Sequence, residues 1–452
     1  MKHVVVVPYP SRGHINPMMN LSKILVSKNA NILVTFLVTQ RWLPTIAAQP
    51  KPLNVRLASL PDPAASADTL ADTVEAVMTQ MEEPLDDLLR RLHPPPAFLL
   101  CDAFLFWTLA VANRRGIPAA AFWTTSSSEL WLHYYHIFQR KQRGCTNSLL
   151  DYIPSISWIR QADIPILDEN NRQILRWALK SYEWLHKAQY LLLPSFYELE
   201  PQVVDALKAS FSIPVYTIGP NIPYFGMEEE NSCHTNGGND GYMDWLDRQP
   251  KSYVLYISYG SYLSISSAQM DEIAYALHDS NVRFFWVTRE DNPRLKEICG
   301  NMGLVVAWCD QLKVLLHPSI GGYWTHCGWN SVIEGVFAGV PFLTFPIVMD
   351  QPLISKIIVE DWKVGWRVKK DDKLDTLVRR DEIAMLLRKF MQLDSDVGRD
   401  MRKRAKELQH MAQMEITKNG SSEINIEAFV KNIVQNGSNN RAQVQNGTDN
   451  LD

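Results

Sequence analysis

Residues 308–351 read WCDQLKVLLHPSIGGYWTHCGWNSVIEGVFAGVPFLTFPIVMDQ, and this stretch decides the fold of the second half of the chain. One short apolar run, Leu304–Ala307, leads into it, and a second, Ile320–Trp324, lies within it. Both have the length and composition of buried strands. After the second run the apolar residues take a helical spacing, at Val332, Ile333, Val336 and Phe337. The stretch therefore predicts two strands of an α/β sheet and a helix that begins beyond the second strand.

The predicted start of this helix carries side chains that suit a phosphate. His326, Asn330 and Ser331 lie between the strand and the helix. The first turn of a helix has backbone N–H groups without intrahelical partners and the positive end of the helix dipole, and both favour an anion. The polar trio and the helix start together predict a site for a phosphate or diphosphate.

Other side chains of the stretch complete a nucleotide-sugar pattern. Trp308 and Gln311 offer a ring that can stack on a base and an amide that can read its edge. Glu334 lies about one turn along the helix, where a carboxylate can accept hydrogen bonds from ribose hydroxyls. Asp350 and Gln351 suit sugar hydroxyls. The set predicts a site for a nucleotide diphosphate sugar.

Each of these residues also has an ordinary structural interpretation. Ser331 with Glu334 forms a capping-box pattern, and His326 is equally consistent with a buried, hydrogen-bonded histidine. Trp308 and Trp329 are equally consistent with core packing. A single residue is therefore weak evidence for ligand binding, and the ordered set carries the prediction.

The stretch resembles the plant secondary-product signature of the family 1 UDP-sugar glycosyltransferases. It matches in length, in the opening tryptophan, in HCGWNS followed by glutamate, and in the closing Asp-Gln. The family's usual Ala-Pro after the tryptophan is Cys309-Asp310 here, which keeps the flanking positions intact. The resemblance implies that Trp308 stacks on uracil, Gln311 hydrogen-bonds it, Glu334 binds ribose, His326, Asn330 and Ser331 hold the diphosphate, Trp329 lies beside the sugar, and Asp350 and Gln351 bind its hydroxyls. It also places Ser261 near the phosphates, after Tyr259, which stands where the family usually has phenylalanine.

A second resemblance to this family lies near the amino terminus. Residues 8–17, PYPSRGHINP, follow the first predicted strand and resemble the family's loop with its general-base histidine, which makes His14 the match. Asp102 follows the run Phe98–Cys101 and precedes Ala103-Phe104, as the family's partner aspartate does. Both residues are expected at the carboxyl ends of parallel strands, the usual edge for active sites in open α/β sheets.

These residues imply an inverting sugar transfer. A histidine such as His14 can remove the proton of an acceptor hydroxyl while Asp102 orients and stabilises the imidazolium. UDP leaves well once its diphosphate charge is held, and direct displacement gives a β-glycoside from an α-linked donor. Gln351 resembles the glucose-using members, whereas histidine at this position is associated with galactose users. We therefore expect a metal-independent UDP-glycosyltransferase without a cofactor, with UDP-glucose as co-substrate.

Alternating strands and helices predict two α/β halves. Predicted strands lie at residues 4–7, 32–38, 98–101, 119–122 and 190–193, and then at 254–257, 284–287, 304–307, 320–324 and 342–345. We expect an acceptor-binding domain (1–223), a linker (224–240), a UDP-sugar-binding domain (241–421), a helix returning to the first domain (422–435) and a polar disordered tail (436–452). The family resemblance implies the GT-B architecture, an α/β fold of two Rossmann-like domains with parallel sheets facing an interdomain cleft.

Composition excludes several classes of protein. The chain has 452 residues with 46% hydrophobic content, which suits a large enzyme of two or three domains, and a net charge of −4 that gives no basic field for nucleic acid. The apolar span Ala103–Ala112 is too short to cross a bilayer, and the amino terminus has no signal-peptide pattern. The six cysteines lack metal-ligand spacing and are typical of free thiols in a reducing compartment. We expect a cytoplasmic monomer that binds small molecules.

The acceptor is less well specified than the donor. Several aromatic side chains could line an apolar pocket for a flat or lipophilic alcohol, phenol or acid, and they are equally consistent with core packing. These are Phe104, Phe122, Trp123, Trp131, Tyr134 and Tyr135.

Three other functions fit the sequence less well. A nicotinamide dehydrogenase would need a G-x-G-x-x-G after a strand, and no predicted strand has one. A metal-dependent glycosyltransferase would need a DxD motif, and Asp394-Ser395-Asp396 lies in a charged stretch typical of a solvated loop. A non-catalytic binder of a UDP-sugar or a lipophilic molecule would need no base, so His14 with Asp102 favours catalysis.

Overall fold

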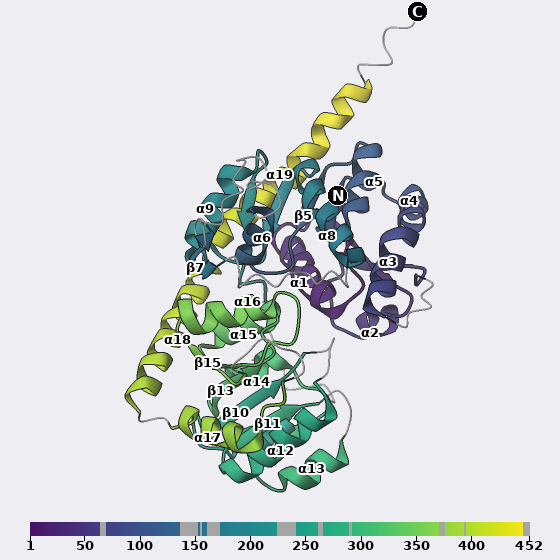
Figure 1. Cartoon of the computed structure of the whole chain (residues 1–452). Helices are drawn as coiled ribbons and strands as arrows, with labels where there is room; N and C mark the ends of the chain where they lie inside the picture. The colour runs from purple at the N-terminus through teal and green to yellow at the C-terminus, as the bar shows by residue number, and fades with distance from the viewer. Residues whose placement is uncertain are drawn as a thin grey trace, which may run out of the picture. The chain divides into compact units, whose positions relative to one another are not determined.

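The computed structural model forms two compact units (Figure 1). It describes residues 1–63, 69–135, 152–153, 156–160, 172–223, 241–260, 265–288, 292–369, 376–392 and 395–445. The first unit comprises Met1–Ser157, Ile166–Phe225 and Glu415–Asp452, and the second comprises Trp158–Pro165 and Gly226–Met414. The predicted linker, 224–240, lies outside the described residues.

A seven-stranded parallel sheet forms the centre of the first unit, in the order β3-β2-β1-β4-β5-β8-β9. Its first strands are nearly continuous β-branched and apolar runs because both faces of a parallel sheet are covered by helices. The strands are β1 (Lys2–Val7), β2 (Ile32–Thr39), β3 (Val55–Leu60), β4 (Phe98–Asp102), β5 (Ala119–Phe122), β8 (Tyr190–Leu193) and β9 (Val215–Thr217).

Most helices of this unit connect consecutive strands, as parallel pairing requires. They are α1 (Arg12–Lys28), α2 (Leu43–Ala47), α3 (Leu70–Gln80), α4 (Glu82–Arg91), α5 (Phe106–Arg114), α6 (Ser127–Tyr134), α8 (Arg172–Trp184), α9 (Pro201–Ser210) and α19 (Ser421–Gln445), with short turns η4 (Leu185–Lys187) and η5 (Tyr197–Leu199). A two-stranded ribbon, β6 (Tyr152–Ile153) and β7 (Ile156–Arg160), lies apart from the large sheet.

The last helix, α19 (yellow in Figure 1), packs on the first unit's sheet although it is the end of the chain. Phe429 meets Phe98 of β4 and Tyr190 of β8 edge-on, at centroid distances of 5.8 and 5.7 Å. Asn425 donates to the carbonyl oxygen of Thr217 in β9 at 2.9 Å. The helix runs to Gln445, so residues 436–445 differ from the predicted disordered tail. Extending an existing helix adds one hydrogen bond for each residue fixed, which allows a polar sequence to continue it.

The second unit repeats the same design with six parallel strands, in the order β12-β11-β10-β13-β14-β15. The strands are β10 (Val254–Ser258), β11 (Arg283–Val287), β12 (Gly303–Val306), β13 (Ile320–Thr325), β14 (Phe342–Thr344) and β15 (Gly365–Arg367). The helices are α11 (Gly241–Asp247), α12 (Ser267–Ser280), α13 (Pro293–Cys299), α14 (Gln311–Leu316), α15 (Trp329–Ala338), α16 (Gln351–Lys356), the π-helical η7 (Ile357–Asp361), α17 (Arg380–Phe390) and α18 (Asp396–Glu415).

Counted within each unit, both sheets follow the order 3-2-1-4-5-6 of the doubly wound fold, to which the first sheet adds a seventh strand. This confirms the prediction of two Rossmann-like α/β halves. The order reverses between β1 and β4 in the first unit and between β10 and β13 in the second. Ligands of such folds bind beyond the carboxyl ends of the strands at this reversal. Within the part of the chain that is described, no helix is both long and apolar enough to span a membrane.

Candidate active site

The predicted catalytic pair meets at the strand reversal of the first sheet. His14 lies in the first turn of α1, which follows β1, and Asp102 is the last residue of β4. The pair is joined by a hydrogen bond of 2.7 Å between His14 Nδ1 and Asp102 Oδ2. Because β1 and β4 pair in parallel, their carboxyl ends bring together two residues that lie 88 positions apart.

Asp102 is fully buried, and backbone donors fix its carboxylate. The N–H of Tyr9 donates to Oδ2 and the N–H of Phe104 donates to Oδ1, both at 3.0 Å. Since the ionised carboxylate only accepts, the hydrogen-bond network assigns the proton of neutral His14 to Nδ1. Nε2 of His14 is then the proton-accepting atom, on a side chain that is 22% exposed. This is the arrangement that a general base needs.

Three residues that the sequence analysis did not assign to the catalytic pair also surround His14. The Tyr9 ring lies 5.1 Å from the imidazole, and Thr124 Oγ1 lies 3.3 Å from Nδ1. Phe104, predicted for the acceptor pocket, meets the imidazole edge-on at 5.6 Å. Tyr9 belongs to the PYPSRGHINP loop and could be found from that motif, whereas Thr124 follows β5 and belongs to no motif.

The other predicted acceptor residues lie in three different surroundings. Trp123 stacks on Phe104 at 4.9 Å, and these two rings form an aromatic wall beside His14. Phe122 packs in the main hydrophobic core of the first unit, so the core interpretation applies to it. Trp131 and Tyr134 are buried and Tyr135 is half-buried, and Trp131 packs against both tyrosines.

In the second unit, α15 begins where the phosphate site was predicted. Its N-cap is Gly328, no side chain caps it, and its first turn contains no acidic residue. Ser331 is the third residue of the helix rather than its N-cap, so the capping-box interpretation of Ser331 and Glu334 is wrong. The uncapped first turn follows β13 at the strand reversal and can receive an anion there.

Glycines on two sides hold the imidazole of His326 at this helix start. A Cβ on Gly260 would lie 2.7 Å from the ring and one on Gly328 would lie 2.5 Å from Nε2, so a larger residue at either position would displace the imidazole. Gly260 follows β10 and has a φ of 71°. Cys327 also has a positive φ, 70°, which is strained for a residue with a side chain. Backbone strain of this kind is typical of functional sites.

Gln311 forms the centre of a polar network below the predicted nucleotide site. Its Oε1 accepts from the hydroxyls of Tyr256 and Tyr323 at 3.0 and 3.1 Å, and its Nε2 donates to Ser331 Oγ at 3.0 Å and Glu334 Oε2 at 2.7 Å. A side-chain amide has two donors and about two acceptor positions, so all are used. The contact of this amide with the base edge stays a prediction. Its engagement by two buried tyrosine hydroxyls was not revealed by the apolar pattern of β10 and β13.

Glu334 is half-buried, and its carboxyl group accepts a hydrogen bond from Gln311. Burial raises the pKa of its carboxyl to about 7, opposed by the hydrogen bond from Gln311 and reinforced by the charge of Asp310. A carboxyl that changes charge near neutral pH at a site edge is a feature of functional sites.

The two signature tryptophans differ in exposure. Trp308, just after β12, is 63% exposed and leaves a ring face open for stacking. Trp329 is only 3% exposed and packs 6.4 Å from Trp362, so the core interpretation applies to its ring.

Asp350 and Gln351 lie at the start of α16, as N-cap and first residue. Gln351 Oε1 accepts from the N–H groups of Ile347 and Val348, at 2.8 and 3.0 Å, and so closes the loop before the helix. Met349 within this loop has a φ of 60°. The loop is thus a second strained segment of the predicted donor site.

Two predicted features fall partly or wholly outside the described residues: Ser261, and Asp394 of the Asp-Ser-Asp sequence. Asp396, which is described, is exposed and pairs with Arg399 on α18. Among the described residues no cluster of three or more His, Cys, Asp or Glu side chains is arranged to hold a metal ion.

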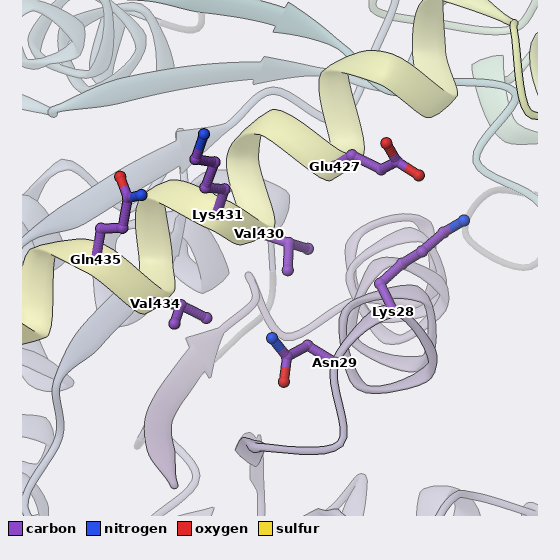
Figure 2. A pocket seen from close by; sticks show the side chains of 7 residues that line it. All are labelled: Lys28, Asn29, Glu427, Val430, Lys431, Val434 and Gln435. Carbon is purple, nitrogen blue, oxygen red and sulfur yellow. The ribbon is translucent and has the colours of Figure 1, made fainter.

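A groove of about 400 Å³ lies at the opposite end of α1 from His14 (Figure 2). Figure 2 shows Val430 and Val434 of α19 pointing toward Lys28 and Asn29. A helix of 17 residues is about 25 Å long, so this groove is remote from the catalytic pair.

Comparison with known proteins places these features in a family. A family model described as UDP-glucoronosyl and UDP-glucosyl transferase matches residues 210–369. The chain is 43% identical to UDP-glycosyltransferase 87A1 of Arabidopsis thaliana over 95% of its own length and 100% of the relative's. The crystal structure of Os79 from O. sativa in complex with UDP superposes with a TM-score of 0.82, at 27% identity over 95% of this chain and 100% of that one. Phytolacca americana UGT2, complexed with UDP-2-fluoro-glucose and pterostilbene, superposes with a TM-score of 0.80, at 26% identity over 96% and 100%. These structures are GT-B glycosyltransferases, which confirms the predicted fold class.

Proposed function

Because this chain belongs to the plant family 1 UDP-glycosyltransferases, we propose that it transfers glucose from UDP-glucose to a hydroxyl or carboxyl group of a small lipophilic acceptor, with inversion at the anomeric carbon. The observation that carries the mechanism is the hydrogen bond of 2.7 Å between His14 and the fully buried Asp102. Nε2 of His14 takes the acceptor proton, and Asp102 stabilises the imidazolium that forms. The deprotonated oxygen attacks the anomeric carbon, the bond to the UDP oxygen breaks, and UDP leaves with its charge stabilised.

Residues of the second unit hold the donor in this proposal. The first-turn N–H groups of α15, with His326, Asn330 and Ser331, receive the diphosphate, and the exposed Trp308 ring stacks on the base. Glu334 accepts from ribose hydroxyls, and Gln311 orients Glu334 and Ser331 through its two donor bonds. Asp350 and Gln351 bind the sugar hydroxyls. Ser261 keeps its proposed place near the phosphates.

Glucose is the proposed sugar because Gln351 occupies the position that resembles glucose-using members, and because a structural relative holds UDP-2-fluoro-glucose. The same relative holds pterostilbene, a flat phenol, which agrees with the aromatic wall of Phe104 and Trp123 beside His14. Competition between UDP-glucose and UDP-galactose at equal concentration, read by mass spectrometry, tests the donor. Galactoside as the main product would refute the assignment.

The reaction needs neither a cofactor nor a metal ion in this proposal, since backbone donors at a helix start supply the charge stabilisation that a cation gives elsewhere. Turnover is therefore expected to survive chelation by EDTA. We further propose that the enzyme acts as a monomer in the cytoplasm, in keeping with the four described cysteines, which are buried free thiols.

The decisive experiment compares His14→Ala with the parent enzyme. UDP affinity should stay nearly unchanged because the nucleotide is held by the second unit, while kcat with an unactivated alcohol falls by on the order of a hundredfold or more. Asp102→Asn should also slow turnover but add little to His14→Ala, since the carboxylate then has no imidazole to orient. A His14→Ala enzyme with normal turnover, or one that no longer binds UDP, would show that His14 is not the base. A parent protein that binds UDP-glucose but never releases UDP with any acceptor would be a non-catalytic binder.

A further inference from the structure

A buried carboxyl group, Glu129, lies behind the aromatic wall of the catalytic pair. It belongs to α6 and is 7% exposed. Its Oε2 accepts from Thr125 Oγ1 at 3.0 Å, and its Oε1 accepts from the Tyr182 hydroxyl at 3.3 Å and lies 3.3 Å from His133 Nε2. Burying a carboxyl group is costly without such partners, so the network must be complete to keep Glu129 in place.

Helix capping does not account for this carboxyl group. The side chain of Ser126 caps the N–H of Glu129, and the carboxylate of Glu200 accepts from the N–H groups of Ser127 and Ser128 at 3.1 and 2.8 Å. Other residues thus accept the hydrogen bonds of the free N–H groups in the first turn of α6. Glu129 directs its carboxyl group back to the turn before the helix, where it meets Thr125.

This turn connects Glu129 to the catalytic histidine. Thr125 Oγ1 accepts from Trp123 Nε1 at 3.1 Å while it donates to Glu129. Trp123 stacks on Phe104, and Phe104 meets the edge of the His14 ring. The neighbouring Thr124 brings its hydroxyl to 3.3 Å from His14 Nδ1. One turn therefore supplies both the support of the aromatic wall and a polar contact to the imidazole.

We propose that Glu129 is a positioning residue for the sugar transfer, which holds the turn Trp123–Thr125 against His14 through the hydroxyl of Thr125. The inference rests on His14 being the base of the proposed reaction. Glu129 touches neither His14 nor Asp102 and acts only through the turn. Without it, Thr125 loses its acceptor, Trp123 loses its orientation, and the imidazole loses the surfaces that keep Nε2 aligned with the acceptor oxygen.

The electrostatics agree with a hydrogen-bonding role rather than an ion pair. Burial raises the pKa of Glu129 to about 7, and burial lowers the pKa of His133 to about 4. At pH 7 His133 is therefore neutral, and the carboxyl group has no opposite charge in this contact. Hydrogen bonds from Thr125, Tyr182 and Trp123 oppose the rise in the pKa of Glu129, so the carboxyl group acts as a hydrogen-bond acceptor for these side chains.

Three substitutions at Thr125 and Glu129 test whether Glu129 acts on His14 through the hydroxyl of Thr125. Thr125→Val removes the hydroxyl between Trp123 and Glu129 and keeps the side-chain shape, Glu129→Leu removes the acceptor, and Glu129→Gln keeps an acceptor oxygen. We expect Thr125→Val and Glu129→Leu to lower kcat with an aliphatic alcohol by about tenfold at an unchanged KM for UDP-glucose, the size expected when a general base is misaligned. Glu129→Gln should recover most of that loss. An acidic phenol, which needs the base least, should be affected little, and neither substitution should slow a His14→Ala enzyme further.

Glu200→Gln is the matched control, because it weakens the anchoring of the same helix from its other side without touching Thr125. It should lower the melting temperature, and any change in kcat should be the same for the alcohol and the phenol. If Thr125→Val leaves kcat unchanged, or if its effect is equal for both acceptors and persists in the His14→Ala enzyme, Glu129 is only structural and the inference is overturned. Thr125→Val also decides the question if Glu129→Leu fails to fold. A normal His14→Ala enzyme would instead contradict the base assignment itself.

Discussion

Tyr256 and Tyr259 lie three residues apart, and their hydroxyls have opposite surroundings. The Tyr256 hydroxyl donates to Gln311 at 3.0 Å. The Tyr259 hydroxyl is buried and, within the described residues, has no hydrogen-bond partner. Tyr259 stands where the family usually has phenylalanine, and its ring packs against Trp324 and Phe345. The ring thus keeps the packing of a phenylalanine. The hydroxyl, which hydrogen-bonds to water in the unfolded chain, loses that bond when it is buried in the folded protein.

These surroundings predict opposite effects for the same substitution. Tyr259→Phe should raise the free energy of unfolding by about 1 kcal/mol, because it removes an unsatisfied polar group. Tyr256→Phe should lower it by about 1 kcal/mol and weaken UDP binding, because Gln311 then loses a bond that orients it toward Glu334. Melting temperatures and UDP titrations of both variants check this. A Tyr259→Phe protein that is as destabilised as Tyr256→Phe would show that the hydroxyl has a partner after all.

The carboxyl group of Glu334 predicts a pH dependence. Its pKa is raised to about 7 in the folded chain. The folded state therefore binds the proton more tightly than the unfolded state does. The stability that comes from this protonation is full below the unfolded pKa, near 4.3 for a glutamate, and is lost as the pH rises through about 7. Glu334→Gln removes this loss, so without ligand it should stabilise the protein at pH 8, by on the order of 1 kcal/mol, and much less at pH 5.

The same substitution should act against the ligand. Ribose hydroxyls donate to a carboxylate more strongly than to an amide oxygen, so Glu334→Gln should weaken UDP binding at pH 8. Melting curves at both pH values, with and without UDP, measure the two effects together. Equal stabilisation at pH 5 and pH 8 would mean that Glu334 does not titrate in this range.

At the scale of elements, the start of α15 depends on the segment after β10. Gly260 has a φ of 71°, and a Cβ there would lie 2.7 Å from the His326 ring. Gly260→Ala should therefore displace His326 from the helix start, and we expect UDP affinity to fall by about tenfold or more, as loss of a charge-assisted contact of 1.5–3 kcal/mol would produce.

Gly116→Ala is the control for backbone strain alone. Gly116 has a φ of 63°, but a Cβ there would meet nothing within 4 Å, and the residue lies in the first unit. Both substitutions should cost about 1 kcal/mol of stability through the left-handed conformation, and only Gly260→Ala should affect UDP titrations. Unchanged UDP affinity in Gly260→Ala would show that His326 does not need its present position.

For the molecule as a whole, the sequence predicted every inner strand of the two large sheets and missed three of their four edge strands. The ten predicted strands are all present, with ends that differ by at most two residues. The unpredicted strands of the large sheets, β3, β9 and β15, are all edge strands. An edge strand is paired on one side only and is often short, so β9 and β15, at three residues each, left no continuous apolar run to detect.

The candidate site was predictable to the extent that motifs mark it. His14 and Asp102 were found because each follows a predicted strand in a recognisable motif, and parallel pairing brings their strand ends together. The surroundings of Gln311 and Trp329 within the protein were not predictable, because the local sequence does not show that the hydroxyls of Tyr256 and Tyr323 donate to the amide of Gln311, or that Trp362 packs against the ring of Trp329. Such facts depend on tertiary packing between distant segments.

The proposed assignment of donor binding to the second unit and of proton transfer to the first gives a prediction for the whole enzyme. Trp308 belongs to the second unit and is proposed to stack on the base, whereas His14 belongs to the first unit and is proposed to act in chemistry. Trp308→Ala should weaken UDP binding by about tenfold or more, since stacking of a base on an aromatic ring contributes about 1–3 kcal/mol. The factor should be the same in the parent and in His14→Ala, because the two side chains share no partner.

This double-mutant cycle compares the parent, Trp308→Ala, His14→Ala and the double variant. UDP titrations measure binding, and single-turnover rates at saturating donor measure the chemical step. Trp308→Ala should leave the saturating rate nearly intact, and His14→Ala should leave the titration nearly intact, so that the double variant shows the product of the two separate losses. Trp308→Phe is the matched control, since it keeps an aromatic ring and should retain most of the affinity. If the loss caused by Trp308→Ala shrinks or grows by more than about twofold in the His14→Ala enzyme, the two units are energetically coupled in donor binding, and the assignment of binding to one unit and chemistry to the other is incorrect.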